Sequence, residues 1–448
     1  MNLIYGIKDK PKFGQIIVFA FQQLLAILAA TIAVPAIIGN GMSQSAALFG
    51  AGVGTIVYLL FTKFSSPVFL GSSFAFIGSM FAAFGGAVSA QAGYFGLILG
   101  AAFAGLVYVA IAIIVKLAGV KWINKIMPAV VIGPTVSIIG LSLAGNAVGD
   151  LKGSMLNAAG EEVANPYCII AGLVTLFVVI LASVYGKKMT KLIPFIIGIL
   201  AGYIVATIFT LVGSKIGNDA MVLIDFSVFS GMKIVALPEF TFIEAAKGIK
   251  EINASYIATI AVAYIPVAFV VFAEHIADHK NLSSIVGVEL LEDPGLHRTL
   301  LGDGIGSFCG AFFGGCPNTT YGESVGCVAI TGNASIVTIF ATAIMALVIS
   351  FFGPFVTFLS SIPSCVMGGV CITLYGFIAV SGLKMIQKVD LGNNRNLFVV
   401  AVILICGIGG LTLTFGKVTL TEVACALILG IIVNAILPKD NTVEEEVK

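Results

Sequence analysis

The sequence carries little charge, and this shortage excludes most soluble proteins. Only 10% of its 448 residues are Asp, Glu, Lys or Arg, whereas 59% are hydrophobic and the mean hydropathy is +1.10. Soluble domains contain roughly 25% charged residues. No charged residue occurs from Phe64 to Val115. We therefore expect a polytopic α-helical membrane protein whose main partner is the lipid bilayer.

Other shortages narrow the range of functions. The 23 basic and 22 acidic residues nearly balance, and no basic run suggests a nucleic-acid partner. The eight cysteines include no Cys-x-x-Cys pair and lie mostly in apolar stretches, so we expect neither a disulfide framework nor a metal site. The N-terminal sequence MNLIYGIKDKPKFG has no cleavage-site pattern, so no removable signal peptide is expected.

Segment length predicts the fold. A helix needs about 20 apolar residues to cross a bilayer. On this basis we expect membrane segments at 14–37, 44–62, 65–84, 94–117, 127–147, 166–186, 191–213, 253–276, 298–315, 317–331, 334–360, 362–382, 396–414 and 418–437. These fourteen form two sets of seven, and the third and tenth are short and interrupted.

Charge distribution gives the expected topology. If both termini are cytoplasmic, 17 of the 23 Lys and Arg residues fall on the inner side, as the positive-inside rule requires. The polar stretches 148–165 and 214–250 then lie outside, the second with short amphipathic structure. The acidic tail 439–448 is expected to be disordered.

Two pairs of similar short sequences indicate an internal repeat. Residues 71–75 (GSSFA) resemble residues 318–322 (NTTYG), each with a small or polar residue, two hydroxyls, an aromatic and a small residue. Pro128 precedes Gly133 by the same offset as Pro363 precedes Gly368. Because seven is odd, the second repeat enters the membrane from the opposite side. Inverted repeats with paired interrupted segments point to a transporter site near the bilayer midplane.

The tenth segment contains the first candidate site residue. Pro317, Gly322 and Gly326 interrupt any helix there, and polar side chains precede Glu323. A carboxylate near the bilayer centre costs about 2.5–3.5 kcal/mol, so it is usually functional or paired. We expect segments 3 and 10 each to place a short β-strand beside a half-helix, with exposed backbone groups directed at a ligand.

The sequence AEHIADH at 273–279 contains the second candidate. Glu274 and Asp278 share one face of a helix, and His275 and His279 share another. The alternative is that the helix simply leaves the membrane here, which suits His279 and Lys280. It suits Glu274 less well, because Glu274 follows an apolar run without a nearby cation.

Carboxylates at 274 and 323 in one pocket would repel each other when both are charged, which favours proton uptake. We expect a neutral, proton-coupled ligand with several N–H donors. A bulky anion does not fit, because no Lys or Arg lies in the core of a predicted segment.

Two other classes of function, an intramembrane protease and a channel, fit the sequence less well. An intramembrane zinc protease needs HExxH, whereas the order here is EHxxDH, and the chain has only three histidines. A channel usually has rings of like residues from repeated subunits, and two unequal interrupted segments suit alternating access better. We expect a transporter without cofactor or bound metal, not an enzyme.

The sequence resembles the nucleobase–ascorbate transporters (nucleobase:cation symporter-2), and within them the bacterial uracil permeases. The resemblance covers nearly the whole chain and is strongest in GSSFAFIG (71–78), AEH (273–275), EDPGLHR (292–298) and FFGGCPNTTYGE (312–323). The family signature begins with Glu or Gln, followed by Asn, any residue and Gly, and it ends with Thr after four further residues. This sequence matches it at Glu323, Gly326 and Thr331. Ser324 replaces the usual Asn.

The resemblance implies proton-coupled import of uracil at the cell (inner) membrane, with a xanthine or urate symporter as the alternative. It implies a core domain (1–120 and 251–360), a gate domain (121–250 and 361–438) and often a homodimer. The implied substrate-binding residues are Glu274, Glu323, Phe74, Gly322, Ala30 and Tyr375. The residues expected to couple transport to protons are Glu274, Asp278 and His275. The residues expected to support the site are Ser73, Asn318, Thr320, Tyr321, Ser324 and Gln23. Asp278 and Gln23 stand where relatives can carry His.

Overall fold

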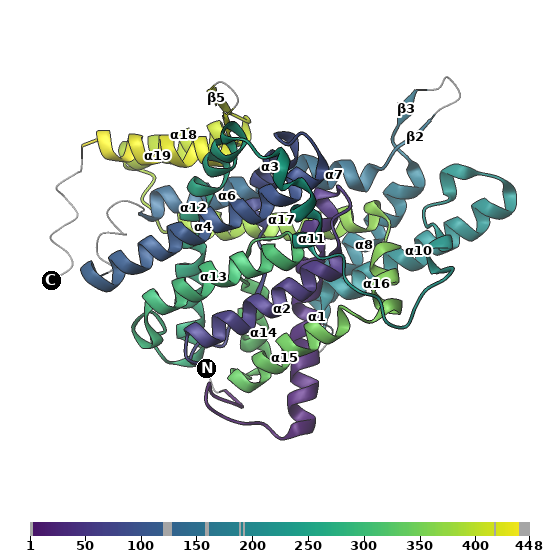
Figure 1. Ribbon diagram of the computed structural model, residues 1–448, viewed down its shortest axis with the longest axis horizontal. Coiled ribbons are helices and arrows are strands. Elements are labelled where there is room, and N and C mark those ends of the chain that lie inside the picture. Colours follow the sequence, from purple (N-terminus) through teal and green to yellow (C-terminus); the bar gives the residue numbers. More distant parts are fainter. Residues whose placement is uncertain are drawn as a thin grey trace.

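The computed structural model describes residues 3–119, 128–156, 161–187, 190, 193–415 and 418–438. Within these residues, eight helical stretches are long and apolar enough to cross a bilayer. They are α1 (Phe13–Ile38), α2 (Gln44–Phe61), α4 (Ala90–Ala118), α6 with α7 (Ala129–Ser142 and Ala144–Lys152), α8 (Pro166–Tyr185), α10 (Pro194–Ile216), α12 (Ala254–Val286) and α17 (Ser364–Ile386) (Figure 1).

The remaining helices complete the fold. They are η1 (Phe74–Phe76) with α3 (Ile77–Gly85), α11 (Thr241–Gly248), α13 (Leu296–Gly314), α14 (Gly322–Thr331), α15 (Ile336–Ile349), α16 (Gly353–Ser360), α18 (Asn394–Ile408) and α19 (Glu422–Ile436). The stretch 214–250, which was expected to lie outside the membrane, contains short 3-10 helices as well as α11. The tail 439–448, predicted to be disordered, lies outside the described residues.

Small residues let neighbouring helices approach closely. A Cβ atom on Gly54 of α2 would lie 2.7 Å from the Gly306 carbonyl oxygen of α13, and one on Gly382 of α17 would lie 2.4 Å from that of Gly133 in α6. The Ser137 hydroxyl of α6 also donates to the Ala379 carbonyl of α17, at 3.1 Å. Close backbone approach through small residues is typical of membrane helices, where water drives no association between them.

Two short strands join distant parts of the chain. Strand β1 (Leu70–Ser72) pairs antiparallel with β4 (Asn318–Thr320), with Gly71 opposite Thr319. The Tyr321 hydroxyl donates to the Ser72 carbonyl at 2.8 Å, and the Tyr321 ring fills the space that a side chain at Gly71 would need. The two similar sequences therefore contact each other directly, and each leads into a short helix.

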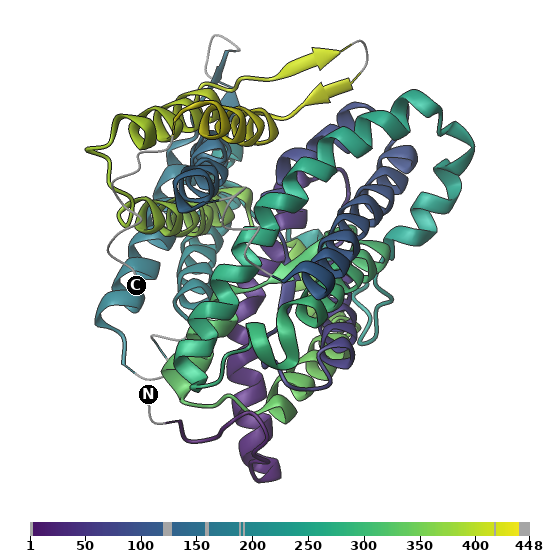
Figure 2. The same cartoon turned by 90° about the vertical axis from the view of Figure 1, so that its left-hand side faces the viewer.

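The helices are arranged around this pair of strands. Helices α2, α4, α12 and α13 pack together, with α1 and α15 against α2. Helices α6, α8, α10 and α17 pack together on the other side, and α18 and α19 contact α6. Figure 2 shows the yellow C-terminal helices α18 and α19 at one edge of the molecule. Helix α12 also contacts α6 and α19, so it lies where the two sets meet.

Two expectations about helix ends are wrong. The eighth segment was expected to end at 276, but α12 continues to Val286, and His279 is 0% exposed instead of surfacing. Its imidazole is held by Tyr58 of α2. The hairpin of β5 (Leu413–Phe415) and β6 (Val418–Leu420) takes the place of the last residues of the segment expected at 396–414 and the first residues of the one expected at 418–437. The alternation of Thr with apolar residues there has the period of a strand.

Candidate functional site

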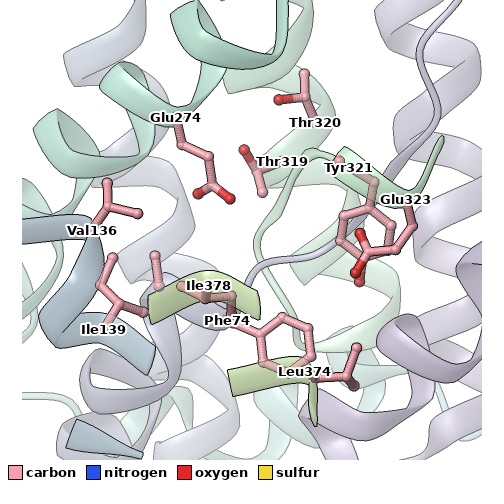
Figure 3. A pocket seen from close by; sticks show the side chains of 12 residues that line it. Phe74, Val136, Ile139, Glu274, Thr319, Thr320, Tyr321, Glu323, Leu374 and Ile378 are labelled. Carbon is pink, nitrogen blue, oxygen red and sulfur yellow. The ribbon is translucent and has the colours of Figure 1, made fainter. Parts of the chain in front are cut away.

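A small, partly open cavity lies next to the paired strands (Figure 3). Its walls come from η1, β4, the start of α14, α12, α6 and α17. The lining residues are Phe74, Ala75, Val136, Ile139, Glu274, Thr319, Thr320, Tyr321, Gly322, Glu323, Leu374 and Ile378.

One side of the cavity is polar and carries two carboxylates. Glu274 projects from α12 towards the centre of the view in Figure 3, and Glu323 lies on the far side of Thr319. Both glutamates are half-buried. Because no Lys, Arg or His lines this cavity, its only ionisable groups besides the Tyr321 phenol are acidic. It therefore suits a ligand that donates hydrogen bonds and carries no negative charge.

Helix starts add backbone groups to the same side. Helix α14 begins at Gly322 and η1 begins at Phe74, and both residues line the cavity. The first N–H groups of a helix have no partner within it, and the helix dipole makes them good donors to acceptor atoms. The cavity thus offers carboxylate acceptors together with backbone donors, which matches a ring bearing both N–H and C=O groups.

The opposite side is apolar. Val136 and Ile139 of α6 and Leu374 and Ile378 of α17 form it. None of these four residues was singled out from the sequence, because apolar residues in a membrane helix look alike whether they face lipid or a pocket. Facing the carboxylates, they would cover the flat faces of a small ring.

Two predicted contact residues are buried but do not line the cavity. Ala30 is 0% and Tyr375 2% exposed, and neither lines the cavity. The Tyr375 ring packs edge-on against Phe74, with 5.8 Å between ring centroids. Tyr375 therefore touches a lining residue and not the empty space itself.

The supporting residues hold the broken segments in place. Gln23 of α1 donates to the Ser324 hydroxyl at 2.5 Å, and the Phe69 backbone N–H donates to the same oxygen at 3.1 Å. Asn318 donates to the Gly50 carbonyl of α2 at 3.1 Å. The Ser73 hydroxyl is buried without a hydrogen-bond partner among the described residues, while its backbone N–H donates to the Pro317 carbonyl.

Asp278 and His275 lie on different sides of α12. Asp278 accepts a hydrogen bond from Thr320, next to the cavity, at 2.8 Å. His275 is fully buried and faces α13, where its Nδ1 lies 2.7 Å from Asp303 Oδ2 and its Nε2 lies 2.9 Å from the Thr299 hydroxyl. His275 is therefore not brought to the cavity.

Asp303 was missed in the sequence, although it carried the same signal as Glu323. It is an acid within the predicted apolar segment 298–315, and it is 0% exposed. Its partner His275 lies 28 residues earlier. Within the described residues, no group of three or more His, Cys, Asp and Glu side chains is placed to hold a metal ion.

Comparison with known sequences identifies the family. The profile of the Permease family, that of the nucleobase–ascorbate transporters, matches residues 14–415. The chain belongs to this family. Permeases are transport proteins, so the chain is a multi-pass membrane transporter, and the metalloprotease alternative is excluded.

Permease relatives match along almost the entire chain. The uracil permease of Bacillus caldolyticus is 39% identical over 438 residues, which cover 97% of this chain and 95% of the relative. The uracil permease of Bacillus subtilis (strain 168) is 38% identical over 438 residues, with the same coverage. That of Escherichia coli (strain K12) is 33% identical over 428 residues, covering 95% and 92%.

Solved structures share the fold. The transmembrane domain of a cyanobacterium bicarbonate transporter, BicA, has a TM-score of 0.65 at 17% identity and covers 96% of this chain and 99% of its own. The murine anion transporter Slc26a9 also has a TM-score of 0.65, at 12% identity, covering 96% of this chain and 68% of its own. At these identities the likeness concerns the fold alone.

Proposed function

We propose that this permease imports uracil together with protons. The observation that carries the proposal is the cavity in which Glu274 and Glu323 face an apolar wall with no cation among the lining residues. A neutral ring with two N–H donors satisfies both carboxylates without placing a further negative charge in the membrane. The names of the relatives that are 33–39% identical support uracil as that ring.

Each side of the ring has a proposed partner. Glu274 and Glu323 accept hydrogen bonds from ring N–H groups, and backbone groups at Phe74 and Gly322 contact the remaining polar edge. The side chains of α6 and α17 cover the ring faces. Tyr375 supports this pocket from behind, since its ring packs against Phe74, while Ala30 contributes only through the buried packing outside the lining.

The proposed transport cycle uses the two sets of helices. We place fourteen segments in two inverted repeats, with residues 1–120 and 251–360 as the core domain and 121–250 and 361–438 as the gate domain. The antiparallel pairing of β1 with β4 suits an inverted repeat. The cavity has walls from α12 and α14 of the core and from α6 and α17 of the gate, so relative movement of the domains would open it to alternate sides.

Proton coupling is assigned to the carboxylates beside the cavity. Glu274 is the first candidate, because it lines the cavity, and Asp278 is the second, because it contacts Thr320. We do not assign proton coupling to His275, because its ring faces Asp303 and not the cavity. We further propose a homodimer in the cell (inner) membrane with both termini in the cytoplasm.

Uptake by purified protein in proteoliposomes tests the proposal. Labelled uracil should accumulate when the outside is acidic, and a protonophore should abolish accumulation. Glu323→Ala should lower uptake about 100-fold, because losing a desolvated charged hydrogen bond costs up to about 3 kcal/mol. Glu292→Ala, at an exposed glutamate, is the matched control.

Two outcomes would contradict the proposal. Full uracil uptake by Glu323→Ala would show that the substrate site lies elsewhere. Stronger competition by unlabelled xanthine than by unlabelled uracil would favour the purine alternative.

A further inference from the structure

A second cavity lies beside the proposed substrate site and has the opposite electrostatic character. It adjoins α12 one turn beyond Glu274 and is partly open to solvent. Its lining residues are Ala129, Ile132, Ala273, Ile276, Ala277, Asp278, Lys280, Asn281, Ser381, Lys384, Met385 and Lys388. We call this space the lysine vestibule. The positive-inside distribution of charge places it on the cytoplasmic side.

Three exposed lysines line the vestibule from two helices. Lys280 comes from α12, and Lys384 and Lys388 come from α17 and the turn after it. None of the three lysine side chains forms a hydrogen bond or an ion pair with another described residue. Asp278 is the only acid in the lining, and it is already hydrogen-bonded to Thr320. The lining therefore carries a net charge of about +2 even when Asp278 is ionised.

The proposed substrate does not account for this charge. Uracil is neutral, so its passage needs no cations. The positive-inside rule explains why lysines lie at this end of the helices, but it does not require lysines of α12 and α17 to face one common cavity. Like charges that share a cavity repel each other unless an anion lies between them.

We propose that the lysine vestibule binds a phosphate-bearing anion from the cytoplasmic side. Lysine ammonium groups bind phosphate as point charges, and Asn281 and Ser381 add uncharged donors to the same lining. Such an anion would connect α12 with α17, helices that belong to the proposed core and gate domains. The proposal rests on the proposed function in taking the transported molecule to be neutral, and on the proposed topology in placing the vestibule on the cytoplasmic side.

Lysine labelling tests the binding directly. Purified protein in nanodiscs of zwitterionic phosphatidylcholine is treated with an amine-acylating reagent, and modification at each lysine is followed by mass spectrometry. Inorganic phosphate is compared with chloride at equal ionic strength. At about ten times the apparent Kd, simple occupancy predicts labelling slowed roughly tenfold at Lys280, Lys384 and Lys388. The exposed Lys63 and Lys215 should be unaffected.

A variant and a second lipid define the ligand. In the double variant Lys384→Gln and Lys388→Gln, phosphate should no longer protect Lys280. Protection by free phosphate in neutral nanodiscs identifies a soluble anion, whereas protection only in nanodiscs with phosphatidylglycerol identifies a lipid headgroup. Equal labelling rates under all of these conditions would overturn the proposal.

Uracil binding in the same preparation separates the two proposals. Protection of the lysines without uracil binding would overturn the proposed function and leave the anion site intact. Uracil binding without protection would overturn the anion site alone.

Discussion

Thr320 donates a hydrogen bond to Asp278 across 2.8 Å, and this contact joins strand β4 to helix α12. Thr320 also lines the proposed substrate cavity, and Asp278 lines the lysine vestibule. The pair therefore stands between the two cavities. A change of charge on Asp278 would alter its hydrogen bond to Thr320. It would therefore act directly on the strand that contains Thr319 and leads to Glu323.

Asp278→Asn tests whether this carboxylate takes part in coupling. Asparagine keeps an oxygen that accepts from Thr320 but cannot carry charge or release a proton. We expect proton-driven accumulation of uracil to fall about tenfold, equivalent to about 1.4 kcal/mol, while exchange of labelled for unlabelled uracil continues. Accumulation at the wild-type level would leave Glu274 as the coupling residue. Thr320→Ser, which keeps the hydroxyl donor, is the control for disturbance of the strand.

Tyr58→Phe tests the buried contact between Tyr58 of α2 and His279 of α12. The Tyr58 hydroxyl lies 2.7 Å from His279 Nε2, and both side chains are 0% exposed. Removing the hydroxyl leaves a buried imidazole nitrogen with only Ser66, at 3.4 Å, nearby. We expect the free energy of unfolding to fall by about 1–3 kcal/mol, measured as a lower midpoint of thermal unfolding in detergent.

Uracil affinity should not change in Tyr58→Phe, because Tyr58 does not line the cavity. Tyr5→Phe is the matched control, since the Tyr5 hydroxyl bonds to Gln15 in an exposed position. Equal midpoints for the two variants would contradict a stabilising role for the Tyr58–His279 contact.

Much of the candidate site was accessible from sequence because charge is rare in this chain. Glu274 and Glu323 stand out against apolar neighbours, and the structure places both on one cavity. The similarity between residues 71–75 and 318–322 marked two segments that pair as strands. In both cases the signal was a local departure from a membrane-spanning pattern, which a single sequence reveals well.

Other features depended on long-range contacts that no local pattern records. The sequence suggested that His279 lies where its helix leaves the membrane. In the structure it is buried, and its ring forms a hydrogen bond with Tyr58, 221 residues away in the sequence. Asp303 stands out locally as an acid in an apolar segment, but its pairing with His275 of another helix leaves no sign in the sequence. The apolar wall of the cavity could not be predicted, since lipid and a ligand ring favour the same side chains.

Gly382→Ala tests the close packing of α17 against α6. A Cβ atom at Gly382 would lie 2.3 Å from the Ser137 hydroxyl and 2.4 Å from the Gly133 carbonyl oxygen. The helices must separate to admit it, at a cost of about 1–3 kcal/mol for overpacking. Gly376→Ala on the same helix is the control, because a Cβ atom there meets nothing within 4 Å. A lower thermal midpoint in Gly382→Ala alone is the expected result, and matching losses would contradict the packing argument.

Ser324→Ala tests the residue at which the sequence departs from the family signature. The Ser324 hydroxyl accepts from Gln23 and from the Phe69 N–H, and both Ser324 and Phe69 are 0% exposed. The variant would leave two buried donors without an acceptor, at about 1–3 kcal/mol each. Because Phe69 directly precedes β1, which leads to Phe74, we expect weaker uracil binding as well as a lower thermal midpoint.

Gln23→Ala should have a smaller effect than Ser324→Ala. It removes one donor but leaves the Ser324 hydroxyl bonded to the Phe69 N–H, so no buried backbone group loses its partner. Ser284→Ala, at an exposed serine of α12, is the control for loss of a hydroxyl and should change neither property. If Gln23→Ala weakened uracil binding more than Ser324→Ala, Gln23 would act on the ligand by another route than through the Ser324 hydroxyl.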